Sequence, residues 1–324
     1  MARADAPSEP PPLNPPAVVL GVVTTNLLDT SEPLPLEAAR QALRLLPGVG
    51  ADWRAYPVEQ VVSPDLFYGV DCKLPGVRGA HPRAIGTVRA RAVLTAGHVV
   101  QGSTRVDVVL DASNRRMPWS YYAARVGAVE AIRKADPAEL VSGFLTARRQ
   151  PGLLDLGGIG SRVMSRLDDI PQVDGRLGMR TEASRLRWAV QVREGEEMGA
   201  EVMVGEDGTF RVAMTAPWAL VPDIVEFCEI LALHQWLLAA LKNAFRRAGS
   251  ASAPMDELDP ALSYLGHLWN PTAHLPTATA WLWAELEVDA QLTWGWDSTL
   301  TRVRDKVALL TRKAIEGTLL KEFQ

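Results

Sequence analysis

Side chains able to do acid–base, nucleophilic or metal chemistry are few and scattered in this chain. It holds five histidines and two cysteines in 324 residues. Cys72 and Cys228 lie far apart, and neither belongs to a Cys-x-x-Cys pair, which predicts two reduced thiols and disfavours a disulfide or a structural zinc site. His98 differs from the other histidines because it lies within a run of strand-like residues, AVLTAGHVV at 92–100. His98 is therefore the first candidate for a catalytic group.

The segment that leads to His98 reads IGTVRARAVLTAGHVV from Ile85. It resembles the strand and turn around the catalytic histidine of trypsin-like serine proteases. The resemblance implies that His98 is a general base for a serine and that an aspartate further along the chain orients it. Asp136, in the sequence ADPAEL, lies at a fitting distance. The resemblance thus implies His98 and Asp136 as catalytic residues.

The nucleophile of that family is a serine in a Gly-x-Ser-Gly turn, and this chain has no such tetrapeptide. Ser161 follows a glycine-rich stretch, but the glycines precede the serine and none follows it. Ser161 also comes too soon after Asp136 to leave room for the second barrel of that family. Helical patterns at 121–149 and after residue 214 also disfavour a double β-barrel. Two interpretations stay open: a trypsin-like protease or degenerate relative, and an ordinary hairpin whose turn uses the backbone freedom of Gly97.

The glycines of the sequence DLGGIG at 155–160 precede a predicted helix at 161–167. Amides at such a helix start can hold a phosphate. The spacing matches neither Gly-x-Gly-x-x-Gly nor the Walker pattern, which favours a plain connector. We therefore expect no cofactor.

Two histidines near residue 270 are the best metal candidates. His267 and His274, with Asp256 or Asp259, could form a mixed ligand set. Their spacing fits no known ligand pattern, and Asp256 is explained as a helix cap with Asp259 in the first turn. We expect no metal site.

Composition narrows the class of protein. The chain is 47% hydrophobic, with a net charge of -4 and a pI near 5.8, which disfavours binding to nucleic acid. The first residues lack the apolar stretch of a signal peptide. The most apolar segment, at 218–245, contains acidic residues, which predicts a buried helix and not a membrane span. These features predict a cytoplasmic protein without a membrane partner.

Hydrophobic periodicity predicts an α+β fold in four parts. Residues 1–16 are a disordered, proline-rich tail. Residues 17–150 form an α/β domain with a strand at 17–23, helices at 36–46, 121–134 and 137–149, and an antiparallel pair of strands at 84–94 and 106–110. Apolar and polar residues alternate along the first of these paired strands, which indicates one buried face and one solvent-exposed face. Residues 151–216 are a connector and a β-meander, with strands at 186–193, 201–204 and 210–214 and a turn at Glu206-Asp207-Gly208.

Residues 217–324 are expected to be a helical subdomain. Pro222 marks the first turn of its first helix, a second helix is predicted at 256–268, and residues 277–320 form one helix or two, divided at Trp294-Gly295-Trp296. In the last stretch an a/d seam follows the spacing of helix-packing positions: Leu300, Val303, Val307, Leu310 and Ala314. Seven of the ten tryptophans lie after residue 216. We expect most to pack inside the subdomain, with a partner surface as the alternative.

The function favoured by these patterns is a non-catalytic interaction or regulatory subunit of a bacterial multi-protein system, such as one used in defence. The helical C-terminal part would bind a protein partner or a second copy. The alternative is a trypsin-like serine protease, or a degenerate relative, with His98 as general base.

Overall fold

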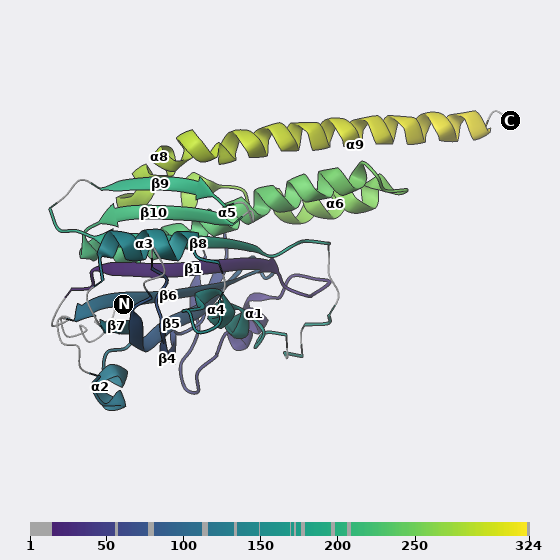
Figure 1. The fold of residues 1–324 in the computed structure, drawn as a ribbon. Helices are drawn as coiled ribbons and strands as arrows, with labels where there is room; N and C mark the ends of the chain where they lie inside the picture. Colours follow the sequence, from purple (N-terminus) through teal and green to yellow (C-terminus); the bar gives the residue numbers. More distant parts are fainter. Residues whose placement is uncertain are drawn as a thin grey trace.

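The computed structural model describes residues 15–55, 58–76, 81–111, 116–132, 135–148, 150–168, 170–171, 173–175, 179–195, 198–205 and 209–322. These residues form a mixed sheet of ten strands with helices on both faces and a helical C-terminal part (Figure 1), which confirms the predicted α+β class. The proline-rich segment predicted as a tail lies outside the described residues up to residue 14.

The sheet runs in the order β2-β3-β5-β7-β6-β1-β8-β10-β9, and β4 pairs with β5 beside this path. The strands are β1 (Val18–Leu27), β2 (Asp52–Arg54), β3 (Gln60–Val62), β4 (Leu66–Lys73), β5 (Arg83–Thr95), β6 (Val99–Asp111), β7 (Ala128–Ile132), β8 (Ser184–Val192), β9 (Gly199–Val204) and β10 (Phe210–Ala216). The run predicted as a buried strand is β1, which pairs antiparallel with both β6 and β8. One sheet therefore crosses the predicted boundary between 17–150 and 151–216.

The helices are α1 (Leu36–Ala42), α2 (Trp119–Ala123), α3 (Pro137–Thr146), α4 (Leu156–Met164), α5 (Val221–Ala248), α6 (Pro254–Leu265), α7 (Pro271–His274), α8 (Ala280–Ala290) and α9 (Leu292–Glu322). Side chains of β1 alternate between two hydrophobic cores. Val19 and Val23 face the core of α5, while Leu20 and Val22 face the core that holds α3 and α4. A strand buried on both faces needs such a continuous apolar run.

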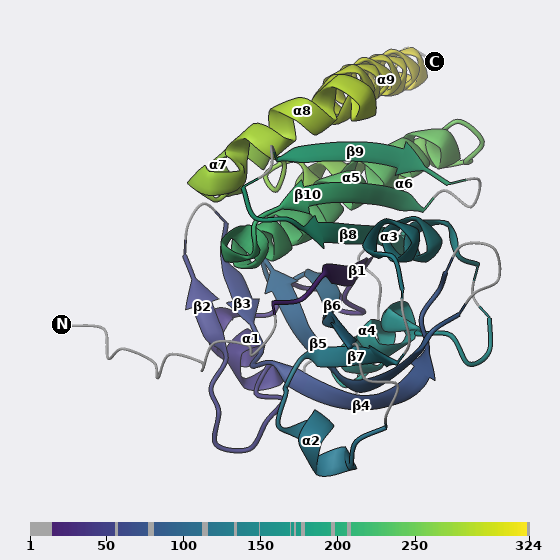
Figure 2. The same ribbon diagram turned by 60° about the vertical axis from the view of Figure 1, so that its left-hand side comes forward.

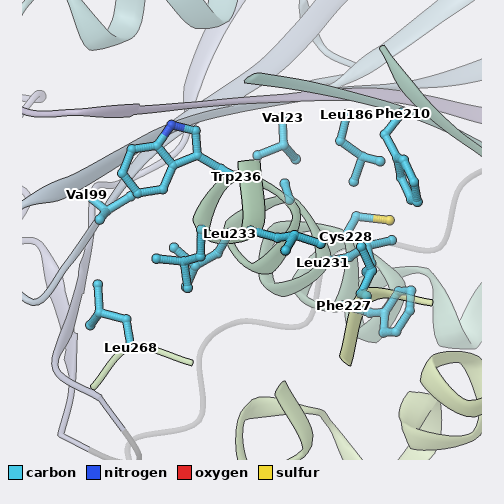
Figure 3. Close-up of a cluster of buried hydrophobic side chains, with 14 of the residues drawn as sticks. Val23, Val99, Leu186, Phe210, Phe227, Cys228, Leu231, Leu233, Trp236 and Leu268 are labelled. Atoms are coloured by element: carbon cyan, nitrogen blue, oxygen red, sulfur yellow. The ribbon is translucent and has the colours of Figure 1, made fainter. Parts of the chain in front are cut away.

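Helix α5 is the long apolar helix expected from the sequence, with Pro222 in its first turn as predicted. It is long and apolar enough to cross a membrane, yet 83% of its most apolar window is buried inside the fold. Figure 3 shows Trp236 of this helix reaching toward Val99 of β6, and Phe227 on the side of the helix away from Val23 and Leu186. The helix is thus the centre of one core.

Strands β5 and β6 form the predicted antiparallel hairpin. Its turn, at residues 96–98, has positive φ at Ala96 (50°) and Gly97 (67°), a backbone sign that follows the strand twist. A Cβ on Gly97 would lie 2.3 Å from the carbonyl oxygen of Leu34, so this position needs glycine. At its far end the hairpin opens and β7 inserts, antiparallel to β5 and parallel to β6.

The predicted helix at 121–134 is wrong. Only the start of that segment is helical, in α2, and residues 128–132 form β7. Gly127, at φ 82°, breaks the helical path, and β7 is then fixed by pairing with two strands. Tertiary pairing overrides the weak local preference of alanine and glutamate for helix.

The predicted β-meander is also wrong in its order. Strand β10 lies between β8 and β9, parallel to β8 and antiparallel to β9. The reason is burial: β10 alternates between buried and half-buried residues and takes the inner position, while the more exposed β9 takes the edge. The predicted turn at Glu206-Asp207-Gly208 lies outside the described residues.

Residues 277–322 contain two main helices. The division falls at Gln291, which has φ 48°, and not at Trp294-Gly295-Trp296, which lies inside α9. The helix predicted from Asp256 begins two residues earlier, so Asp256 lies in the first turn and Ala253 takes the cap position. Figures 1 and 2 show α9 running past α6 to the C-terminus.

Candidate functional site

His98 is the last residue of the hairpin turn, directly before β6. Its side chain is 4% exposed. Its amide donates to the carbonyl oxygen of Thr95 (3.1 Å), and its own carbonyl oxygen accepts from the amide of Leu28 (2.7 Å). Burial lowers the pKa of the imidazole below its usual value, nearby His267 adds to this effect, and Glu32 opposes it. The surroundings therefore favour a neutral, enclosed His98.

Asp136 is the cap of α3. Its carboxylate accepts from the amides of Ala138 (2.8 Å) and Glu139 (3.1 Å). It follows β7, whose last residue pairs with the first residue of β5, whereas His98 follows the last residue of β5. Thirteen strand residues span about 40 Å when straight. The structure thus places the two predicted catalytic residues at opposite ends of β5 and does not bring them together.

Ser161, the weak nucleophile candidate, lies inside α4. Its hydroxyl donates to the carbonyl oxygen of Gly157 (3.0 Å), one turn back. Neither the serine nor its neighbouring glycines form a turn that exposes the hydroxyl, because α4 already begins at Leu156. Ser161 therefore has the surroundings of an ordinary helical serine.

The glycines before Ser161 lie within α4 and let it approach the sheet. Asp155 accepts from the amide of Gly158 (2.9 Å) and so caps the helix start. A Cβ on Gly102 of β6 would lie 2.6 Å from the carbonyl oxygen of Gly160. Close helix–strand packing is the visible role of these glycines.

The metal candidates show no shared centre. His267 is exposed, and the side chain of His274 lies outside the described part of the chain. Among the described residues, no group of three or more His, Cys, Asp or Glu could hold a metal ion. Burial, with a contribution from Asp71, raises the pKa of the Cys72 thiol to about 11, and burial raises that of Cys228 as well.

Most tryptophans of the C-terminal part pack internally. Trp236, Trp283 and Trp296 are buried, and Trp269 stacks on Trp296 with ring centres 4.3 Å apart. Trp294 is the exception, with 69% of its surface exposed. The internal packing expected for most of these residues is therefore what the structure shows.

The seam of α9 changes along the helix. Val303 is fully buried, Val307 and Leu310 are half-buried, and Ala314 is exposed. Every residue from 311 to 316 is exposed. We call residues 308–316 the arm. Its exposed apolar residues include Leu309 (49%) and Ile315 (57%).

Sequence reasoning missed a cluster of arginines on the β5–β6 hairpin. The face of β5 that holds Arg89 and Arg91 was expected to be exposed to solvent. Both arginines are instead half-buried, next to the first turn of α5. Arg91 donates from Nε and Nη2 to both carboxylate oxygens of Glu229 on α5 (2.8 and 2.7 Å). The alternation was readable in the sequence, whereas the helix that covers it comes from far along the chain.

No family model, curated protein or solved structure matches this chain.

Proposed function

We propose that this protein is an interaction subunit that binds a partner through the arm of α9. The observation that carries the proposal is the loss of cover along one apolar seam, from the buried Val303 to the exposed Ala314. An a/d pattern that continues beyond its own packing partners offers its last positions to another helix.

The first half of α9 is anchored, which makes the arm a rigid extension. Trp296 stacks on Trp269, and the guanidinium of Arg302 lies 4.9 Å from the ring centre of Phe245 on α5. A continuous helix anchored at one end holds its other end in place, so little conformational entropy is lost when a partner binds.

The charges beside the seam indicate the chemistry of the partner. Arg304, Lys306 and Lys313 occupy the positions next to the a/d residues, where interhelical ion pairs form. Glu316 lies away from the seam and pairs with Arg312 (2.8 Å). Two copies would place like charges together, so the favoured partner is an amphipathic helix with acidic flanks.

No catalytic step is part of the proposal. It is supported by the separation of His98 from Asp136 and by the enclosure of His98. Labelling by a serine-hydrolase probe that His98→Ala abolishes would overturn this part of the proposal.

The arm is tested by giving it charge and measuring peptide binding. The probe is a labelled helical peptide with leucine at a and d and glutamate at e and g, read by fluorescence anisotropy. We expect binding by the wild type, no binding of the same peptide with lysine at e and g, and at least about tenfold weaker binding by Leu310→Asp/Ala314→Asp, which puts charge on the seam itself, because burying an unpaired carboxylate is costly.

Two controls make this test specific. Thr301→Asp places the same charge on an exposed position of the anchored half and should leave peptide binding unchanged. Val303→Asp buries a charge in the core and should unfold the subdomain, so it does not report on association. Equal binding of both peptides, or a wild-type dimer that persists at high salt, would contradict an acidic helical partner.

A further inference from the structure

A small pocket lies between the β5–β6 hairpin and the first turn of α5. It has a volume of about 120 Å³. Its charged lining residues are Arg89, Arg91, Arg105 and Asp65, and Ser103, Pro222 and Val225 also line it. Both Pro222 and Val225 belong to α5, whose positive dipole end is at this terminus. The pocket is thus built by three elements and dominated by arginine.

Strand register forces two of these arginines together. Arg89 of β5 stands directly opposite Arg105 of β6, and Arg91 stands opposite Ser103. Like charges directly opposite each other in an antiparallel pair are destabilising. A fold that keeps this arrangement gains stability from any anion placed between the two guanidinium groups.

Two of the three arginines have acidic partners. Arg91 makes the bidentate pair with Glu229, which is 7% exposed. Arg89 pairs with Asp65 (3.0 Å), and its guanidinium lies 5.4 Å from the ring centre of Phe67. These two carboxylates offset two of the three positive charges.

Arg105 has no ion-pair or hydrogen-bond partner within the described part of the chain, and its Nε is buried. Burial lowers the pKa of its guanidinium; Asp107 and Asp65 oppose this, while Arg89 and Arg91 add to it. A buried charge is costly unless it is paired. The pocket therefore holds one guanidinium that makes no hydrogen bond or ion pair within the described part of the chain, beside two that carboxylates engage.

We propose that this pocket binds a phosphate group, either inorganic phosphate or the terminal phosphate of a phosphorylated small molecule. Guanidinium groups bind the oxygens of phosphate in a fork geometry, and Ser103 adds a hydroxyl donor from the same strand as Arg105. The small volume admits the phosphate group itself, so the remainder of a larger ligand would extend out of the pocket. This binding is independent of the arm of α9.

The first test is calorimetric titration of the full chain with inorganic phosphate. We expect saturable binding by the wild type and at least about tenfold weaker binding by Arg105→Gln, since charged hydrogen bonds are lost. Arg40→Gln is the matched control, because Arg40 is an exposed arginine outside the pocket, and it should bind phosphate as the wild type does. Absence of saturable binding, or equal weakening by Arg40→Gln, would overturn the proposal.

Thermal unfolding gives a second readout. Phosphate should raise the melting temperature of the wild type and leave that of Arg105→Gln unchanged. Should Arg105→Gln not fold, Ser103→Ala removes one donor without changing the charge and should weaken phosphate binding several-fold. An unchanged affinity in that variant would then count against the site.

Further titrations separate the two ligand sources. Tighter binding of glycerol 3-phosphate than of inorganic phosphate would assign the site to phosphorylated small molecules, and the reverse order would assign it to the free ion. Acetate at the same ionic strength should not compete. Equal competition by acetate would show a general anion site and overturn the assignment to phosphate.

Discussion

At the scale of single residues, the segment around His98 resembles a catalytic motif and also forms a tight hairpin turn. The small residues before His98 are required by positive φ at Ala96 and Gly97 and by the close approach of Leu34 to Gly97. The histidine then ties the turn to the chain beyond β1 through its backbone bond with Leu28. Turn geometry and close packing thus require small residues in the segment that resembles a protease site.

The lowered pKa of His98 predicts a pH dependence of stability. The unfolded chain has a histidine pKa near 6.5, and the folded value lies below it, so the unfolded state binds more protons on acidification. The contribution of His98 is fully present above pH ~6.5 and is lost as the pH falls through the folded pKa. Urea unfolding at pH 7.5 and pH 5.5 should show a lower free energy of unfolding at the acidic pH.

Variants at two histidines identify the source of that effect. His98→Gln should flatten the pH profile over this range. His267→Gln should retain most of the slope, because burial is the largest cause of the shift and His267 a smaller one. A profile that His98→Gln leaves as steep as the wild type would assign the dependence to other groups.

At the scale of elements, the packing of α4 on β6 depends on glycine at the contact. Gly102→Ala should destabilise the fold by about 1–3 kcal/mol, because its Cβ would meet the carbonyl of Gly160, and a backbone atom cannot move aside cheaply. Gly199→Ala is the matched control: it lies in strand β9, and its Cβ would meet nothing within 4 Å. Equal free energies of unfolding for the two variants would contradict this role.

Local pattern was enough for some elements and not for others. The β5–β6 hairpin and α5 were predictable, because alternation and a helical apolar face are properties of one segment. Strand β7 was not, because its sequence AVEAI has little strand preference and is fixed by the two strands that it joins. The inner position of β10 likewise depends on burial, which is a property of the whole sheet.

The same distinction applies to the candidate sites. The seam of α9 was readable from its spacing, but only the structure shows where its cover ends, between Leu310 and Ala314. Arg89 and Arg91 were visible as one face of a strand. Their cover by α5 and the opposition of Arg89 and Arg105 follow from long-range pairing, which spacing along one segment does not reveal.

At the scale of the whole molecule, the first and last parts of the chain share their cores. Strand β1 lies between β6 and β8, and one of its faces packs against α5. Trp188 of β8 and Trp236 of α5 are both fully buried in this core. The helical part therefore covers one face of the sheet, and it also supports the arm.

Truncation tests this dependence. A chain ending at Ala216 would lack α5 and expose the sheet face that contains Trp188 and Phe210. Each large buried side chain of α5 contributes about 1.5–3 kcal/mol, so the loss exceeds the typical stability of ~5–15 kcal/mol. We expect this chain to bind ANS and to unfold without a cooperative transition. A chain ending at Thr311 removes residues 312–316, all of which are exposed, together with the residues that follow them, and should melt within a few degrees of the wild type. A cooperative transition in the shorter chain would mean that the sheet folds without α5.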